Sequence, residues 1–152
     1  PGQNYWNLKN TPKIVGGITK NCTDIGTALY GTLCNEVVQV SSARAAEMTK
    51  LLENTFRATN IGLVNEMAII SQKLDIDIWE IVEAAKTKPF GFMPFYPGPG
   101  LGGHCIPVDP RYLDWKLETL NSESKFIKLS EEVVMNPFSL KSFAIFLNSS
   151  GI

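Results

Sequence analysis

Cys105 is the residue of this sequence best placed for covalent chemistry. It lies in the run Gly-Gly-His-Cys-Ile-Pro-Val-Asp-Pro, residues 102–110, where a glycine-rich segment meets a predicted helix. That helix begins either with Pro107 at its first position or with Asp109 as its N-cap. In both cases the thiol lies near the positive end of the helix dipole, which favours the nucleophilic thiolate. The alternative is a free cysteine that only packs in the core.

Other side chains could assist such a thiol. Gly102 and Gly103 let a ligand approach the backbone closely and expose N–H donors to it. Lys50 and Asn54 are four residues apart, so they share one face of a helix, where an ammonium and an amide could hold a water or an oxyanion. The alternative for this pair is a solvated helix face. The alternative for Asp109 is an ordinary capping role before a proline.

The counts of histidine and cysteine limit the kinds of site. One histidine, His104, and three widely spaced cysteines argue against a metal site and against a disulfide framework. This cysteine usage is typical of the reducing cytoplasm, where we expect the protein to be located. Cys22 and Cys34 lack the surroundings of Cys105, and we expect both to be packing residues. A cysteine hydrolase using His104 would need an orienting partner, which the sequence does not offer.

The composition is that of an ordinary globular protein. The chain has 152 residues, 44% of them hydrophobic, and a formal net charge of −1. This balance gives no electrostatic reason to expect nucleic acid or an anionic membrane as a partner. No stretch approaches the roughly 20 apolar residues that cross a bilayer, so we expect no membrane association.

Hydrophobic periodicity predicts the elements that position these residues. Short strands are expected at residues 13–17 and 36–40, with a helix between them. A long helix should run from Ser41 or Ser42 to about Leu74. Its apolar positions follow steps of three and four and form one continuous stripe: Met48, Leu52, Phe56, Thr59, Leu63, Met67, Ile70 and Leu74. Such a helix either packs against further copies of the chain, giving a homodimer or a higher homo-oligomer through residues 43–74, or is the buried centre of a larger domain.

The rest of the chain is helical around one long loop. Helices are expected at 75–86, near 110–120 and at 123–135, and residues 89–110 form a proline- and glycine-rich loop. We therefore predict a mainly α protein with two short N-terminal strands. Its predicted divisions are 1–42 (the end of an α/β domain), 43–136 (a helical domain carrying the loop) and 137–152, which remains unassigned.

Several runs of the sequence resemble the UDP-glucose/GDP-mannose dehydrogenase family. In chain order they are residues 10–17, 46–56, 65–68 and 98–109. The form of residues 88–100 is most similar to the UDP-N-acetylglucosamine (more generally UDP-N-acetylhexosamine) 6-dehydrogenase branch. The resemblance covers about residues 1–132. It implies that the strands belong to the end of a Rossmann domain and that the helices form the family's central dimerisation domain.

The resemblance also implies a role for each candidate residue. Cys105 would be the nucleophile, Lys50 and Asn54 would bind the catalytic water and stabilise oxyanions, and Asp109 would support proton transfer and hydrolysis. The implied substrate-binding residues are Phe95, Tyr96, Gly100, Leu101, Gly102 and Gly103. The implied reaction oxidises the C6 alcohol of a UDP-N-acetylhexosamine to the uronic acid. Two hydrides pass to NAD, through a thiohemiacetal and a thioester on the cysteine.

Other readings stay open beside this one. UDP-glucose or GDP-mannose is an alternative substrate, and a non-catalytic dimerisation fragment is an alternative function. The family's Gly-x-Gly-x-x-Gly domain for NAD should precede Pro1 and its C-terminal domain should follow. We therefore expect a fragment that alone neither binds NAD well nor turns over.

Overall fold

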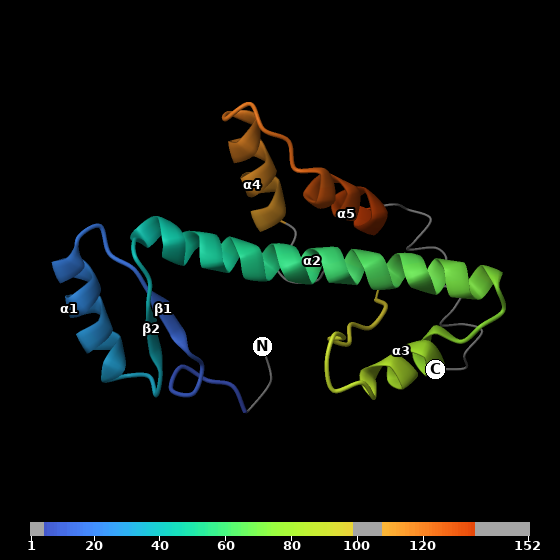
Figure 1. Cartoon of the computed structure of the whole chain (residues 1–152), viewed down its shortest axis with the longest axis horizontal. Coiled ribbons are helices and arrows are strands. Elements are labelled where there is room, and N and C mark those ends of the chain that lie inside the picture. The colour runs from blue at the N-terminus through green and yellow to red at the C-terminus, as the bar shows by residue number, and fades with distance from the viewer. Residues whose placement is uncertain (1–4, 99–107, 136–152) are drawn as a thin grey trace. The chain divides into compact units, whose positions relative to one another are not determined.

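The computed structural model describes residues 5–98 and 108–135. The chain divides into two compact units, residues 1–52 and residues 53–152. The long helix α2, Ala43–Lys73, begins in unit 1 and continues in unit 2 (Figure 1). The predicted fold class is confirmed, because the described residues form five helices and two short parallel strands.

Unit 1 contains a β-α-β arrangement. Strand β1, Lys13–Val15, pairs in parallel with β2, Val37–Gln39, and Ile14 lies opposite Val38. Helix α1, Lys20–Gly31, connects the two strands. The side chain of Thr19 caps α1 by accepting a hydrogen bond from the backbone N–H of Cys22, which fixes the start of the helix.

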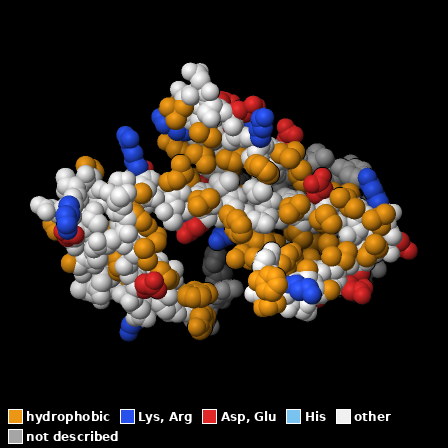
Figure 2. All heavy atoms as spheres, in the orientation of Figure 1, with side chains coloured by type: hydrophobic (Ala, Val, Ile, Leu, Met, Phe, Trp, Pro, Cys, Tyr) orange, Lys and Arg blue, Asp and Glu red, His pale blue; other side chains and the backbone are white. Residues whose placement is uncertain are grey.

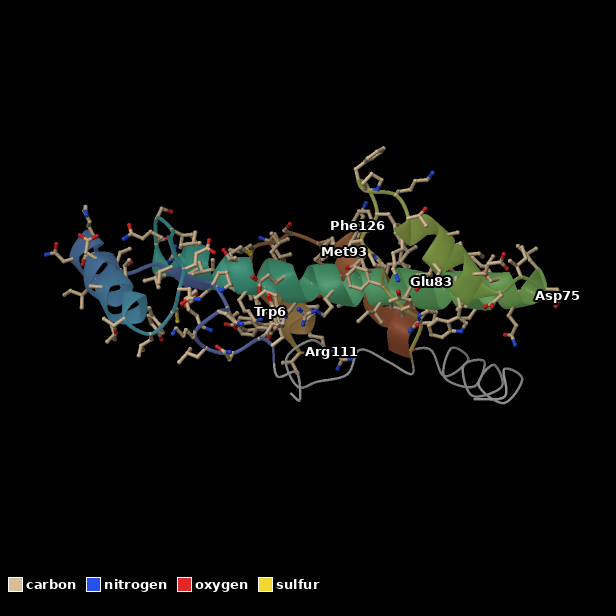
Figure 3. All side chains as sticks on the ribbon, turned by 90° about the horizontal axis from the view of Figure 1, so that it is seen from below. Trp6, Asp75, Glu83, Met93, Arg111 and Phe126 are labelled. Carbon is tan, nitrogen blue, oxygen red and sulfur yellow. The ribbon has the colours of Figure 1, made fainter. Side chains whose placement is uncertain are left out.

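Unit 2 contains the second part of α2 and three shorter helices. They are α3, Ile78–Lys86; α4, Asp109–Glu118; and α5, Lys125–Met135. Helix α3 begins three residues later than the pattern predicts, because Asp75 takes the left-handed conformation (φ 57°) and ends the preceding helix. Asp77 then caps α3 through the backbone N–H of Trp79. Figure 3 labels Asp75 at the end of α2 and Glu83 on α3.

The core of unit 2 lies between α2 and α3. Val64, Ile78 and Val82 are buried together, with Phe95 packed against them. The helical hairpin of α4 and α5 is joined by a hydrogen bond from the Ser124 hydroxyl to Asp114. None of the described helices is long and apolar enough to cross a membrane.

Helix α2 turns its small and polar residues inward. The buried positions in unit 2 include Asn54, Ala58, Gly62 and Asn65, which follow one another at steps of four, four and three. The large apolar side chains of the predicted stripe are exposed instead, with Leu63 at 56% and Leu74 at 63%. Figure 2 shows hydrophobic side chains gathered over this part of the surface. A row of exposed large apolar side chains along one helix of a single chain marks an interaction surface.

Candidate active site

Two of the predicted site residues, 55 positions apart in the sequence, are in direct contact. The amide Nδ2 of Asn54 on α2 donates a hydrogen bond to the carboxylate Oδ2 of Asp109 at 2.5 Å. Asn54 is 1% exposed, so its amide depends on this partner. The bond fixes the orientation of the Asn54 amide and leaves its second N–H as a donor and its carbonyl oxygen as an acceptor.

Asp109 is the first residue of α4, whereas one of the two predicted helix starts made it the N-cap. The cap position is Val108, which makes no side-chain capping bond, and Pro110 lies in the first turn. Because the Asp109 carboxylate faces α2, it is not used for capping. A negative charge in the first turn still interacts favourably with the helix dipole.

Lys50 lies on α2, one turn before Asn54. The structure therefore gives the two residues the helical spacing that the sequence predicts. Lys50 is exposed, and it belongs to unit 1, whereas Asn54 belongs to unit 2.

The predicted substrate residues Phe95 and Tyr96 occupy different surroundings. The ring of Phe95 is partly buried and meets that of Phe56 edge to face, with centroids 5.8 Å apart. The ring of Tyr96 stacks on that of Trp79 with centroids 5.9 Å apart. The Tyr96 hydroxyl donates to Glu83 at 2.7 Å. The two aromatic side chains therefore attach this segment to α2 and α3 respectively.

Glu83, Lys86 and Tyr96 form a small charged cluster beside this segment. Lys86 donates to Glu83 at 2.7 Å and to the Tyr96 hydroxyl at 3.4 Å. The pKa of Glu83 is lowered mainly by the hydrogen bond from Lys86 and next by the hydrogen bond from Tyr96. The same bond to Glu83 raises the pKa of Lys86. Both charged forms are favoured, so the cluster holds Tyr96 over the neutral pH range.

Asn65 is a buried polar residue that sequence reasoning did not assign to the site. It is 6% exposed, and its Oδ1 accepts a hydrogen bond from the backbone N–H of Gly98 at 2.9 Å. The partners are 33 positions apart, which no local pattern connects. Two sequence signals point to Asn65: it begins residues 65–68, one of the runs that resemble the family, and it shares a helical face with Asn54, eleven residues or about three turns earlier.

The remaining predicted residues lie outside the described part of the chain. They are Gly100, Leu101, Gly102, Gly103, His104 and Cys105. Of the other two thiols, Cys34 is buried as expected. The expectation for Cys22 is wrong, because it is exposed in the first turn of α1. Hydrogen bonds from Thr19 lower the pKa of the Cys22 thiol.

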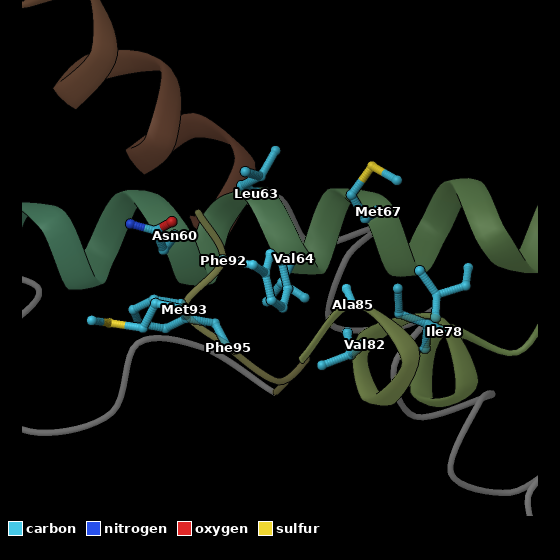
Figure 4. Close-up of a pocket in the computed structure, with 11 residues that line it drawn as sticks. Asn60, Leu63, Val64, Met67, Ile78, Val82, Ala85, Phe92, Met93 and Phe95 are labelled. Atoms are coloured by element: carbon cyan, nitrogen blue, oxygen red, sulfur yellow. The ribbon is translucent and has the colours of Figure 1, made fainter. Parts of the chain in front are cut away.

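A mainly apolar cavity of about 150 Å³ lies between α2, α3 and residues 92–95 (Figure 4). Leu63 and Met67 of α2, Ile81 of α3 and Phe92 are among its walls. It offers no cluster of titratable groups, so it is part of the packing surface rather than a chemical site.

Solved structures with this fold define the class of protein. The chain aligns with the UDP-D-ManNAc dehydrogenase from Pyrococcus horikoshii at 29% identity and a TM-score of 0.79. The alignment covers 95% of this chain and 34% of the Pyrococcus chain. The UDP-N-acetyl-mannosamine dehydrogenase from Staphylococcus aureus aligns over 94% of the chain and 32% of its own, at 35% identity and a TM-score of 0.70. The class is that of the nucleotide-sugar dehydrogenases.

Residues 44–136 match the central domain of the UDP-glucose/GDP-mannose dehydrogenase family, and the chain belongs to that family. It is 40% identical over 133 residues to the UDP-N-acetyl-D-mannosamine dehydrogenase of Campylobacter jejuni, which covers 88% of this chain and 32% of the relative. It is 35% identical over the same length to the NDP-N-acetyl-D-galactosaminuronic acid dehydrogenase of Ralstonia nicotianae, covering 88% of this chain and 30% of the relative. The chain thus spans about a third of the length of these relatives.

Proposed function

We propose that this chain supplies the nucleophile and part of the sugar site for oxidation of the C6 alcohol of a UDP-N-acetylhexosamine to the uronic acid. The observation that carries this proposal is the hydrogen bond between Asn54 and Asp109. It joins two residues that the family motifs assign to one site. Cys105 lies four residues before Asp109 in the sequence, and the family motif assigns both residues to the same site.

Each residue has a distinct part in the non-redox steps. The thiolate of Cys105 attacks the C6 carbonyl and forms a thiohemiacetal; after oxidation, water attacks the resulting thioester and releases the acid. The Asn54 amide, held by Asp109, and the ammonium of Lys50 stabilise the oxyanions of both attacks. The Asp109 carboxylate accepts a proton from the attacking water. Phe95, Tyr96 and the backbone of residues 100–103 hold the nucleotide sugar.

NAD is the proposed acceptor of the two hydrides, but the described residues do not fit it. A dinucleotide cradle needs glycines open to the pyrophosphate. Here a Cβ at Gly16 would lie 2.1 Å from the backbone oxygen of Ser42, and one at Gly17 would lie 2.6 Å from the Cβ of Cys22. These glycines therefore serve close packing within the chain. We expect the chain alone to show no NAD reduction with a UDP-sugar.

We further propose that the protein is a homodimer in which the exposed apolar side of α2 contacts a second copy. The exposed Leu63, Ile70 and Leu74 support this arrangement. Because the chemistry needs a reduced thiol, we place the protein in the cytoplasm. A dimerisation module without chemistry would use the same surface but would not need a reactive Cys105.

The test is an alkylation experiment that follows each cysteine by peptide mass spectrometry. We expect Cys105 to react rapidly near neutral pH and UDP-N-acetylmannosamine or UDP-N-acetylgalactosamine to protect it. Exposed Cys22 serves as the reference thiol in the same molecule, since it should react equally with and without sugar. UDP-glucose and GDP-mannose are the competing ligands. An inert Cys105, or one that no sugar nucleotide protects, contradicts the proposal and favours the dimerisation module.

A further inference from the structure

Two buried asparagines of α2 hold the residues on either side of segment 99–107. Asn54 and Asn65 are 1% and 6% exposed, and both lie on the inward side of the helix. Asn54 donates to Asp109, just after the segment, and Asn65 accepts from the N–H of Gly98, just before it. A buried amide that loses its partner is costly, so each bond holds the helix and the neighbouring chain together.

Gly98 ends a segment that is attached to unit 2 at every residue. Phe95 packs against Phe56 and the core, and Tyr96 stacks on Trp79. Pro97 is buried. Proline lacks an N–H, so Gly98 is the next residue with a backbone donor. The Oδ1 of Asn65 accepts a hydrogen bond from this donor and so attaches Gly98 to α2.

Asn54 and Asn65 are eleven residues apart on α2, which places them about 16 Å apart along the helix.

We propose that Asn65 is a positioning residue of the nucleotide-sugar site: by holding the N–H of Gly98, it fixes the start of the segment that carries Cys105. This inference rests on the proposed function for its meaning, because the residue being positioned is the proposed nucleophile. Asn65 itself does not touch the reacting atoms. It acts through the backbone of Gly98.

The test compares four proteins: the wild type, Asn65→Leu, Asn65→Asp and Asn60→Leu. Asn65→Leu removes the acceptor at nearly constant volume, whereas Asn65→Asp keeps an oxygen that can accept from Gly98. Asn60→Leu is the matched control. Asn60 lies on the same helix, and its amide donates to the backbone oxygen of Phe56 instead of to the loop.

Two readouts separate positioning from a merely structural role. Hydrogen exchange of the Gly98 amide reports the bond itself, and the alkylation rate of Cys105 relative to Cys22 reports its consequence. In Asn65→Leu we expect Gly98 to exchange roughly three to ten times faster, as the loss of one hydrogen bond predicts. The Cys105 rate should change by about the same factor. Asn65→Asp should restore both values, and Asn60→Leu should change neither.

Exchange of the α3 amides, residues 78–86, shows in the same spectra whether unit 2 remains folded. If Asn65→Leu unfolds α3, Asn65→Asp is compared with the wild type instead. The proposal then requires that Gly98 exchange and the relative Cys105 alkylation rate be the same in these two proteins. Unchanged Gly98 exchange in folded Asn65→Leu overturns the proposal. So does faster Gly98 exchange without any change at Cys105. Because no sugar is added, the result is independent of whether a UDP-sugar protects Cys105.

Discussion

At the scale of single residues, Asn54 and Asp109 should be energetically coupled. Asn54→Asp places two carboxylates face to face at a buried position, and we expect it to lower the free energy of unfolding by about 1–3 kcal/mol. Adding Asp109→Asn should recover most of this loss, because the donor and the acceptor are then exchanged. Urea unfolding of the wild type, both single variants and the double variant measures the coupling. Losses that simply add would contradict it.

The hydrogen bond from Lys86 lowers the pKa of Glu83 most, and the hydrogen bond from Tyr96 has the next largest effect. Lys86→Met should raise this pKa more than Tyr96→Phe does. Because the folded-state pKa of Glu83 lies below its ordinary value, Glu83 contributes stability that is fully present above the ordinary pKa and is lost as the pH falls through the folded-state pKa. A carbon-13 NMR titration of the Glu83 carboxyl in the three proteins checks the order. Equal pKa values in all three would show that the cluster does not form.

At the scale of elements, the sequence predicts which residues share a helical face but not which face turns inward. Apolar residues spaced three and four positions apart on α2 predicted one apolar stripe. In the structure Leu63 of this stripe is exposed, whereas Asn54 and Asn65 are buried. Periodicity contains no information about what covers a face. The start of α3 was predicted three residues too early, because periodicity does not show that Asp75 takes the left-handed conformation and that Asp77 caps the helix. The bond from Gly98 to Asn65 could not be predicted, since it depends on how a loop folds back.

The turn between β1 and α1 requires glycine at position 16. A Cβ at Gly16 would lie 2.1 Å from the backbone oxygen of Ser42, and this oxygen cannot move without shifting the start of α2. Gly16→Ala should therefore lower the free energy of unfolding by about 1–3 kcal/mol. Gly31→Ala is the matched control, because nothing lies within 4 Å of its added methyl group and alanine favours a helix. Thermal unfolding compares the two, and equal melting temperatures would refute the close contact at Gly16.

In the assembled protein, we propose that a second copy of the chain covers the apolar side of α2. A stable interface of this kind buries about 1,200–2,000 Å² in total. Exposed apolar side chains of α2 in unit 2, together with Leu74 just after the helix, could form part of such an interface: Phe56, Leu63, Met67, Ile70 and Leu74. The adjoining cavity walls, with Ile81 and Phe92, would extend it.

Leu63→Lys should convert the dimer into a monomer without unfolding the chain, because Leu63 is already 56% exposed in a single copy. Gln72→Lys is the control. It adds the same charge to an exposed position on the same helix, nine residues or about half a turn of rotation away from Leu63. Light scattering behind size exclusion should give twice the chain mass of 16.8 kDa for the wild type and for Gln72→Lys, and the single mass for Leu63→Lys. Because association depends on concentration, the measurement should cover about a hundredfold range. A wild-type chain that stays monomeric throughout would mean that another part of the assembly covers this side of α2.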